Sequence, residues 1–309
     1  MPRFAVIDVG TNSVKFHVGE RGADGRWTTI VDRAEVTRLG EGLAATGGAF
    51  SPEAMERTAA AIAGMAAEAA QAGAVAIAAV GTMGMRTARN SEAFIDDVAR
   101  RAGVRIEVIS GAEEGRVAYL AVKSGLGLAD GSLVVFDTGG GSSQFTFGRG
   151  ATVTEQFSVN VGAVRFTEQY GLGGVVSSAA LQRALDAMAG DLARLDGAAS
   201  PDALVGMGGA VTNLTAVMLG LSTYDPNAVQ GARLPRAEVE RQIELYRSRA
   251  TEARRQIVGL QPKRADVILA GACIVRTIMD KLRKDALSVS DRGLRHGVLV
   301  DRFGEPIGS

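Results

Sequence analysis

The most constraining feature of this sequence is an internal repeat of a short strand–turn–strand pattern. The segments Asp8–Gly19 (DVGTNSVKFHVG) and Asp137–Gly148 (DTGGGSSQFTFG) agree at five of twelve positions without a gap. In both segments an aspartate ends an apolar strand, and small residues then form a turn into a second strand. Glycine matches alone carry little weight in a chain with 40 glycines, but the shared context strengthens them. The repeat predicts two α/β domains, each opening with a β-hairpin.

The order of the predicted elements restarts in the second half of the chain, as a duplication requires. The Gly-rich polar segment 123–131 (KSGLGLADG) marks the expected boundary, so we predict domains at 1–124 and 125–309. In the first domain we predict strands at 3–9, 14–20, 27–36, 75–81 and 105–109, and helices at 52–71, 91–102 and 111–123. In the second we predict strands at 132–138, 143–148, 151–159 and 203–206, and helices at 163–170, 178–195, 209–219, 235–248, 263–283 and 292–303.

Composition argues against several classes of protein. Lys and Arg together number 34, as do Asp and Glu, and this balance is unlike that of a nucleic-acid-binding protein. No run approaches the ~20 apolar residues of a membrane span, so we expect no membrane insertion. The single Cys273 excludes an internal disulfide, favours a cytoplasmic location and is expected in the core. The two histidines, His17 and His296, lie far apart in the sequence, which argues against a histidine-built zinc centre.

The two repeated turns are candidate anion sites. Their small residues let backbone N–H groups converge on an anion, and three consecutive glycines permit close approach. Asp8 and Asp137 would repel a phosphate directly, so they make sense beside a cation. Ordinary hairpins also select Gly and Asn for turn geometry, and that alternative stays open for each turn taken alone. The residues that supply N–H or hydroxyl groups are Thr11, Ser13, Gly139, Gly140, Gly141, Ser142 and Ser143.

Two further segments carry polar chemistry. In Leu204–Leu214 (LVGMGGAVTNL) an apolar strand passes through Gly208 and Gly209 into a helix, whose N-terminus favours anions. In Gly111–Tyr119 (GAEEGRVAY) Glu113 and Glu114 begin a helix, and a carboxylate there can deprotonate a water. A tight strand–helix turn explains the glycines equally well, and acidic residues favour helix N-termini without any function. Arg86 and Lys15 are candidate phosphate partners or plain surface charges.

In order and context, these segments resemble the exopolyphosphatase/guanosine pentaphosphate phosphatase family. The resemblance covers nearly the whole chain. It implies duplicated ribonuclease-H-like domains of the sugar kinase/heat-shock-70/actin superfamily, with the active site in the cleft between the domains. It also implies hydrolysis of a terminal phosphoanhydride in inorganic polyphosphate or guanosine pentaphosphate. The segments that carry it are Asp8–Phe16 (DVGTNSVKF), Gly111–Tyr119, Asp137–Ser143 (DTGGGSS), Gly206–Gly209 (GMGG) and Ser290–Gly297 (SDRGLRHG).

The resemblance further implies roles for individual residues. Glu114 matches the general base, and Asp137 and Asp8 match carboxylates linked to Mg²⁺, the expected cofactor. Gln144 stands where the family usually has Glu, and an amide oxygen is a weaker ligand for a hard dication. Arg264 matches a basic position near the far end of the substrate. The positions that match phosphate-binding residues are Thr11, Asn12, Ser13, Lys15, Arg86 and the 139–143 backbone.

For the substrate we expect short-chain polyphosphate, with guanosine pentaphosphate handled weakly or bound as an inhibitor. Residues 233–264 hold nine Lys/Arg against four Asp/Glu, which fits either a basic track or a solvated helix face. We expect the extra C-terminal domains of longer family members to be absent, which argues against long processive runs. A kinase of the same superfamily and a non-catalytic sensor of guanosine tetra- or pentaphosphate remain as alternatives. We expect a homodimer.

Overall fold

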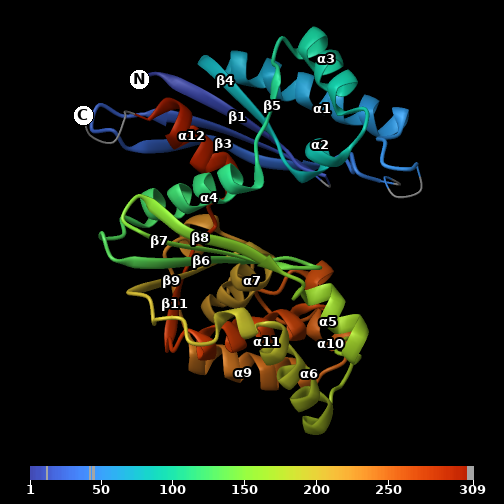
Figure 1. The fold of residues 1–309 in the computed structure, drawn as a ribbon, viewed down its shortest axis with the longest axis vertical. Coiled ribbons are helices and arrows are strands. Elements are labelled where there is room, and N and C mark those ends of the chain that lie inside the picture. Colours follow the sequence, from blue (N-terminus) through green and yellow to red (C-terminus); the bar gives the residue numbers. More distant parts are fainter. Residues whose placement is uncertain (12, 42, 44–45, 305–309) are drawn as a thin grey trace. The chain divides into compact units, whose positions relative to one another are not determined.

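The computed structural model describes residues 1–11, 13–41, 43 and 46–304 and divides into two compact units (Figure 1). Unit 1 comprises residues 1–121 and those from 293 onward, and unit 2 comprises residues 122–292. Each unit is an α/β domain with its own sheet and hydrophobic core.

Unit 1 is built on a five-stranded sheet in the order β3-β2-β1-β4-β5. The first three strands form an antiparallel meander, whereas β4 pairs parallel with both β1 and β5. The strands are β1 (Arg3–Val9), β2 (Ser13–Arg21), β3 (Trp27–Val36), β4 (Ala74–Gly81) and β5 (Ile106–Val108). The helices are α1 (Pro52–Gln71), α2 (Met83–Thr87), α3 (Ser91–Ala102), α4 (Gly111–Leu126) and α12 (Leu294–Phe303).

Helices cover both faces of this sheet because alternate residues of β1 point to opposite sides. Ile7 belongs to the core formed with α1 and α3, whereas its neighbour Val6 packs with Val298 and Leu299 of α12. Figure 1 accordingly has α1 and α3 on one side of the strands and α12 on the other. Helix α1 begins as predicted: Ser51 is its N-cap and accepts a hydrogen bond from the backbone N–H of Ala54.

Unit 2 repeats this arrangement with a six-stranded sheet in the order β10-β11-β9-β6-β7-β8. Strands β6, β7 and β8 form the antiparallel meander, and β9 pairs parallel with β6 and β11. Five strands of each unit thus share one order, which confirms the predicted duplicated fold. The strands are β6 (Ser132–Thr138), β7 (Ser143–Arg149), β8 (Thr152–Val159), β9 (Ala203–Met207), β10 (Arg233–Pro235) and β11 (Ala286–Val289).

The helices of unit 2 pack around α11, which is buried along most of its length beside α9, α7 and α5 (Figure 1). Cys273 of α11 is fully buried, as predicted, and burial raises the pKa of its thiol to about 12. The helices are α5 (Ala163–Tyr170), α6 (Ser178–Asp191), α7 (Gly208–Leu219), α8 (Pro226–Val229), α9 (Arg236–Arg247), α10 (Thr251–Arg254) and α11 (Ile268–Lys281), with short 3-10 turns η1 (Ala193–Leu195) and η2 (Pro262–Arg264).

The structure differs from the predicted division at 124/125 in two ways. The C-terminal helix α12 belongs to unit 1, because its apolar face packs on β1 and its Phe303 ring stacks on Phe4, with ring centroids 4.6 Å apart. The division between the units also falls inside α4, which runs on to Leu126 instead of ending before a linker. The short strands β10 and β11 were not predicted, since three or four residues carry too little periodicity. In the described part of the chain, no helix has the length and apolar character needed to cross a membrane.

Candidate active site

The repeated hairpins of the two units close in the same way. In unit 1 the N–H of Gly10 donates to the carbonyl of Ser13 (3.1 Å), and in unit 2 the N–H of Gly139 donates to the carbonyl of Ser142 (2.9 Å). Cross-strand pairing sets Asp8 opposite Lys15 and Asp137 opposite Gln144. The duplication read from the sequence therefore extends to equivalent hydrogen bonds and an equivalent register.

The turn of unit 2 presents backbone donors. Among the hydrogen bonds of the described residues, none has the N–H of Gly140, Gly141 or Ser142 as its donor. The carbonyls on the other side of the turn are occupied, because those of Gly139 and Gly140 accept bonds from the first N–H groups of α5. Consecutive N–H groups without internal acceptors are a common way to bind an anion.

Ser143 does not contribute its hydroxyl to this turn, contrary to the prediction. Its side chain is fully buried, and Oγ lies 2.7 Å from the carbonyl of Val161 and 3.1 Å from Oγ1 of Thr138. Ser143 is the first residue of β7, where its side chain points into the core of unit 2. It therefore has a structural role.

The start of α7 lies next to this hairpin at the carboxyl ends of β6 and β9. Gly208 has φ +83°, and a Cβ there would come 2.1 Å from Oδ1 of Asp137. A Cβ on Gly209 would come 2.5 Å from Cζ of Arg264, so this guanidinium lies over the first turn of the helix. The N-cap residue Met207 makes no side-chain capping bond. Unit 2 thus brings Asp137, Gly208, Gly209 and Arg264 together.

Unit 1 gathers its candidates at the corresponding edge of its sheet. The Lys15 ammonium lies 3.4 Å from Oδ2 of the buried Asp8. Thr11 packs between two glycines: Gly40 donates its N–H to the Thr11 carbonyl (2.8 Å), and a Cβ on Gly84 of α2 would come 2.7 Å from Oγ1 of Thr11. The hairpin is thereby tied to α2. Asn12, a predicted phosphate-binding residue, lies outside the described residues.

Arg86 of helix α2 contacts Glu114, the predicted general base. Both Nη1 and Nη2 of Arg86 lie 3.1 Å from Oε2 of Glu114, and Nη1 also donates to the carbonyl of Ile109 (2.7 Å). The Glu114 carboxylate is 37% exposed, so it is oriented by the arginine while water still reaches it. Its neighbour Glu113 instead accepts from Arg302 of α12 (2.9 Å), which gives it a structural role.

Part of the positive charge at 233–264 is paired or buried and therefore forms no open track. Arg241, Arg247 and Arg255 each pair with a glutamate three residues earlier, at 2.6–2.8 Å. Arg254 is fully buried, and its guanidinium donates to several backbone carbonyls. Arg264 forms no ion pair with any residue that the structure describes, and it remains the candidate for a substrate contact.

The donor set beside α7 fits a hard dication. Directly paired residues point to the same face of a sheet, so Asp137 and Gln144 offer a carboxylate and an amide oxygen side by side. Mg²⁺ is usually bound by one or two carboxylates plus substrate phosphates and water, not by an all-protein cage. In unit 1 the Lys15 ammonium already lies beside Asp8, which makes that carboxylate the poorer ligand.

Comparison with known proteins finds relatives over nearly the whole chain. The model of the Ppx/GppA phosphatase family matches residues 18–305. The chain is 30% identical to Exopolyphosphatase 2 of Mycobacterium tuberculosis, with 98% of this chain and 99% of the relative covered. It is 29% identical to the guanosine-5'-triphosphate,3'-diphosphate pyrophosphatase of Vibrio atlanticus, of which it spans 60%. A crystal structure of the Aquifex aeolicus Ppx/GppA phosphatase is similar, with TM-score 0.91, 32% identity and coverage of 98% of this chain and 100% of that one.

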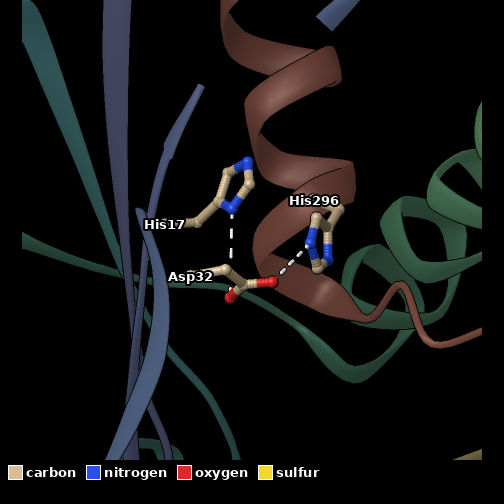
Figure 2. A group of neighbouring side chains, drawn as sticks. All are labelled: His17, Asp32 and His296. Atoms are coloured by element: carbon tan, nitrogen blue, oxygen red, sulfur yellow. Dashed lines mark hydrogen bonds and ion pairs between the residues drawn. The ribbon is translucent and has the colours of Figure 1, made fainter. Parts of the chain in front are cut away.

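The two histidines lie together, contrary to the expectation from their separation in the sequence. His17 of β2 and His296 of α12 have ring centroids 4.6 Å apart, and both face Asp32 of β3 (Figure 2). The His17 Nδ1–Asp32 Oδ1 distance is 3.9 Å, and the His296 Nε2–Asp32 Oδ2 distance is 3.1 Å. No sequence signal could have found this cluster, because it exists only where α12 docks on the sheet of unit 1.

The hydrogen bonds around this cluster argue against a metal centre. The N–H of Gly293 donates to Nδ1 of His296 (3.2 Å), so the imidazole proton lies on Nε2 and is donated to Asp32. A metal on Nε2 would force that proton onto Nδ1, where it would oppose the N–H of Gly293. Arg295 moreover holds both carboxylate oxygens of Asp32, at 2.6 and 3.0 Å. The cluster therefore links the first turn of α12 to β3 through the bonds of Arg295 and His296 to Asp32.

We expect the stability that this contact between α12 and β3 provides to depend on pH, because Asp32 is titratable. Burial raises the pKa of Asp32, but hydrogen bonds from His296 and Arg295 outweigh it and hold the pKa well below the usual 3.8. A depressed carboxyl pKa stabilises the folded state above about pH 4, and this contribution is lost as the pH falls further. Asp32→Asn should thus lower the free energy of unfolding by about 2 kcal/mol at pH 7, and by less at pH 3. Urea titrations followed by the emission of Trp27 measure both values.

Asp24→Asn is the matched control, because Asp24 is 63% exposed in its pairing with Arg26 and should change stability by under about 0.5 kcal/mol. An equal loss for Asp32→Asn at both pH values would contradict the role of the charge. Zn²⁺ that stabilised the wild type but not Asp32→Asn would show a metal site instead.

Proposed function

Because the chain belongs to the Ppx/GppA phosphatase family, we propose that it is an exopolyphosphatase that hydrolyses the terminal phosphoanhydride of short-chain inorganic polyphosphate. The observation that carries the chemistry is the Arg86–Glu114 pair. A carboxylate that is oriented by an arginine and open to water fits a base that acts next to a phosphate.

In the proposed reaction Glu114 accepts a proton from a water molecule. The water oxygen forms a bond to the terminal phosphorus while the bridging P–O bond breaks, and the shortened chain leaves with the bond's electron pair. The products are orthophosphate and a polyphosphate that is one unit shorter, and the proton on Glu114 returns to solvent. Arg86 contacts Glu114 and is proposed to bind the terminal phosphate as well, so that base and phosphorus are held in register.

Neutralising and orienting the polyanion is the other requirement of phosphoryl transfer. We assign this work to the N–H groups of Gly140, Gly141 and Ser142, the N-terminus of α7, and Arg264 in unit 2. In unit 1, Lys15 and the turn at Thr11 have the equivalent role. Asp137 and Gln144 would hold Mg²⁺, which supplies positive charge to the phosphate oxygens when bound.

The extent of similarity supports polyphosphate over the nucleotide. The chain covers 99% of Exopolyphosphatase 2 but only 60% of the guanosine pyrophosphatase. Within residues 233–264, Arg241, Arg247 and Arg255 are each paired with a glutamate, which fits a short substrate better than a long track. One observation favours a second candidate, a guanosine tetra- or pentaphosphate sensor: Gln144 is a weak metal ligand, and binding without turnover would follow from poor metal affinity.

The substrate proposal is tested by measuring phosphate release with Mg²⁺ from short polyphosphate, long polyphosphate and guanosine pentaphosphate, without any acceptor. We expect the highest kcat/KM for short polyphosphate and a fall in binding at raised salt, since recognition is largely ionic. A clear preference for guanosine pentaphosphate would overturn the substrate while leaving a hydrolase. Release only in the presence of an acceptor would indicate a kinase, and binding without release a sensor.

Glu114→Gln should lower turnover about 10²-fold or more with little change in polyphosphate affinity, because the amide keeps its contact with Arg86 but cannot accept the proton. Steady-state kinetics and equilibrium binding measure the two effects. Glu113→Gln is the control: it weakens the bond to Arg302 and should leave turnover nearly unchanged. Comparable turnover in Glu114→Gln and wild type would remove Glu114 from the role of base.

The metal proposal predicts that chelation abolishes phosphate release and that Mg²⁺ restores it. Gln144→Glu should bind Mg²⁺ more tightly and lower the concentration needed for half-maximal release, since a carboxylate replaces an amide beside Asp137. Asp137→Asn should raise that concentration. Titration with Mg²⁺ measures all three proteins, and a rate that chelation leaves unchanged would exclude the metal.

A further inference from the structure

Arg264 lies in an electrostatically unfavourable place for an isolated cation. Its guanidinium rests on Gly209 in the first turn of α7, where the helix dipole is positive. No residue that the structure describes forms an ion pair with it. The guanidinium and the positive end of the helix repel each other, and a bound anion would relieve that repulsion. Such a site requires other residues to hold the arginine in place.

Asn213 supplies that fixation from inside unit 2. Its side chain is 1% exposed, one turn along α7 from Gly209. Nδ2 donates to the carbonyl of Gly209 (2.9 Å), and Oδ1 accepts the N–H of Gln261 (2.9 Å). The two partners fix the orientation of the amide, because a flipped side chain would face oxygen with oxygen and N–H with N–H. A single residue thus joins the start of α7 to the residue that precedes η2.

The segment that carries Arg264 is held at three points. A Cβ on Gly259 would come 2.3 Å from the carbonyl of Ala216, so the segment lies directly on α7. Asn213 bonds Gln261, whose carbonyl accepts the N–H of Arg264 (2.8 Å). After Arg264, the carbonyl of Ala265 accepts from the buried Arg254 (3.3 Å). Of these three contacts, the one at Gln261 is made by a side chain that also bonds the start of α7, because Asn213 donates to the carbonyl of Gly209.

We propose that Asn213 is a positioning residue for phosphate binding, which holds the Arg264 guanidinium over Gly209 so that both act on one phosphate group. The inference rests on the proposed function and adds to it the device that sets the distance between two anion-binding groups. Asn213 itself is buried and touches no substrate. Its loss should therefore act through Arg264 and have no effect where Arg264 is absent.

The test measures binding of inorganic tripolyphosphate by calorimetry, together with KM and kcat. Asn213→Leu removes both hydrogen bonds at similar volume, and Gly209→Ala displaces the flexible guanidinium directly without touching Asn213. We expect Arg264→Ala and each of these variants to weaken tripolyphosphate binding and raise KM about tenfold, with kcat changed by no more than about threefold. The double variant Asn213→Leu/Arg264→Ala should bind no more weakly than Arg264→Ala alone.

Two controls separate positioning from general damage. Thr215→Val alters another fully buried side chain of α7, whose hydroxyl donates within the helix to the carbonyl of Val211. Lys263→Ala removes the neighbouring charge, which does not lie on Gly209. Both should leave tripolyphosphate binding within about twofold of wild type. Melting temperatures show whether each variant folds. If Asn213→Leu does not fold, Asn213→Asp replaces it in the test, because an aspartate keeps the acceptor for the N–H of Gln261 but loses the donor to the carbonyl of Gly209.

Additive losses in the double variant, or wild-type affinity in a folded Asn213 variant, would overturn the inference. Binding of tripolyphosphate without hydrolysis by the wild type would overturn the proposed function alone, because the coupling between Asn213 and Arg264 is still measured by binding. A wild type that did not bind tripolyphosphate would overturn both.

Discussion

The parallel pairing of β1 with β4 and of β6 with β9 decides where chemistry can lie in this protein. In each unit the first strand and its parallel neighbour end at the same edge of the sheet, with Asp8 beside Val80 and Asp137 beside Met207. The hairpin turn and the start of the following helix are therefore forced together. Everything assigned to phosphate binding lies at these two edges, because backbone N–H groups are available where strands end and helices begin.

The two copies of this edge have diverged in charge while keeping their geometry. Unit 1 has an ammonium group opposite its aspartate, and unit 2 has an amide at the equivalent place, Gln144 against Lys15. In the same way the short α2 of unit 1 carries Arg86, which contacts Glu114, whereas the longer α7 of unit 2 has Arg264 over its first turn. One unit thus carries the proposed base, and the other carries the proposed oxygen ligands and backbone donors.

Most helices and strands were predictable because their apolar periodicity, caps and glycines are local signals. The boundaries of α1, β6 and α7 agree with the predicted ranges to within a residue or two. Predictions based on separation along the chain were less successful. His17 and His296 form one cluster, and α12 belongs to unit 1, because the chain returns to its first sheet at the end. Charge counting at 233–264 could not tell which cations are paired, and Arg241 and Arg247 of α9 contact glutamates on the same helix.

The sequence by itself determined the duplication and the two hairpins with their aspartates, and it supplied the residues that are proposed to bind phosphate or accept a proton. It did so because turn geometry and strand patterning depend on residues that are close together in the sequence. Only the tertiary structure decided which of them meet. The contact of Arg86 with Glu114, the burial of Ser143 and the place of Arg264 over Gly209 each join segments at least 18 residues apart, as Ser143 and Val161 are. Such contacts depend on how helices pack on the sheets, and no local pattern records them.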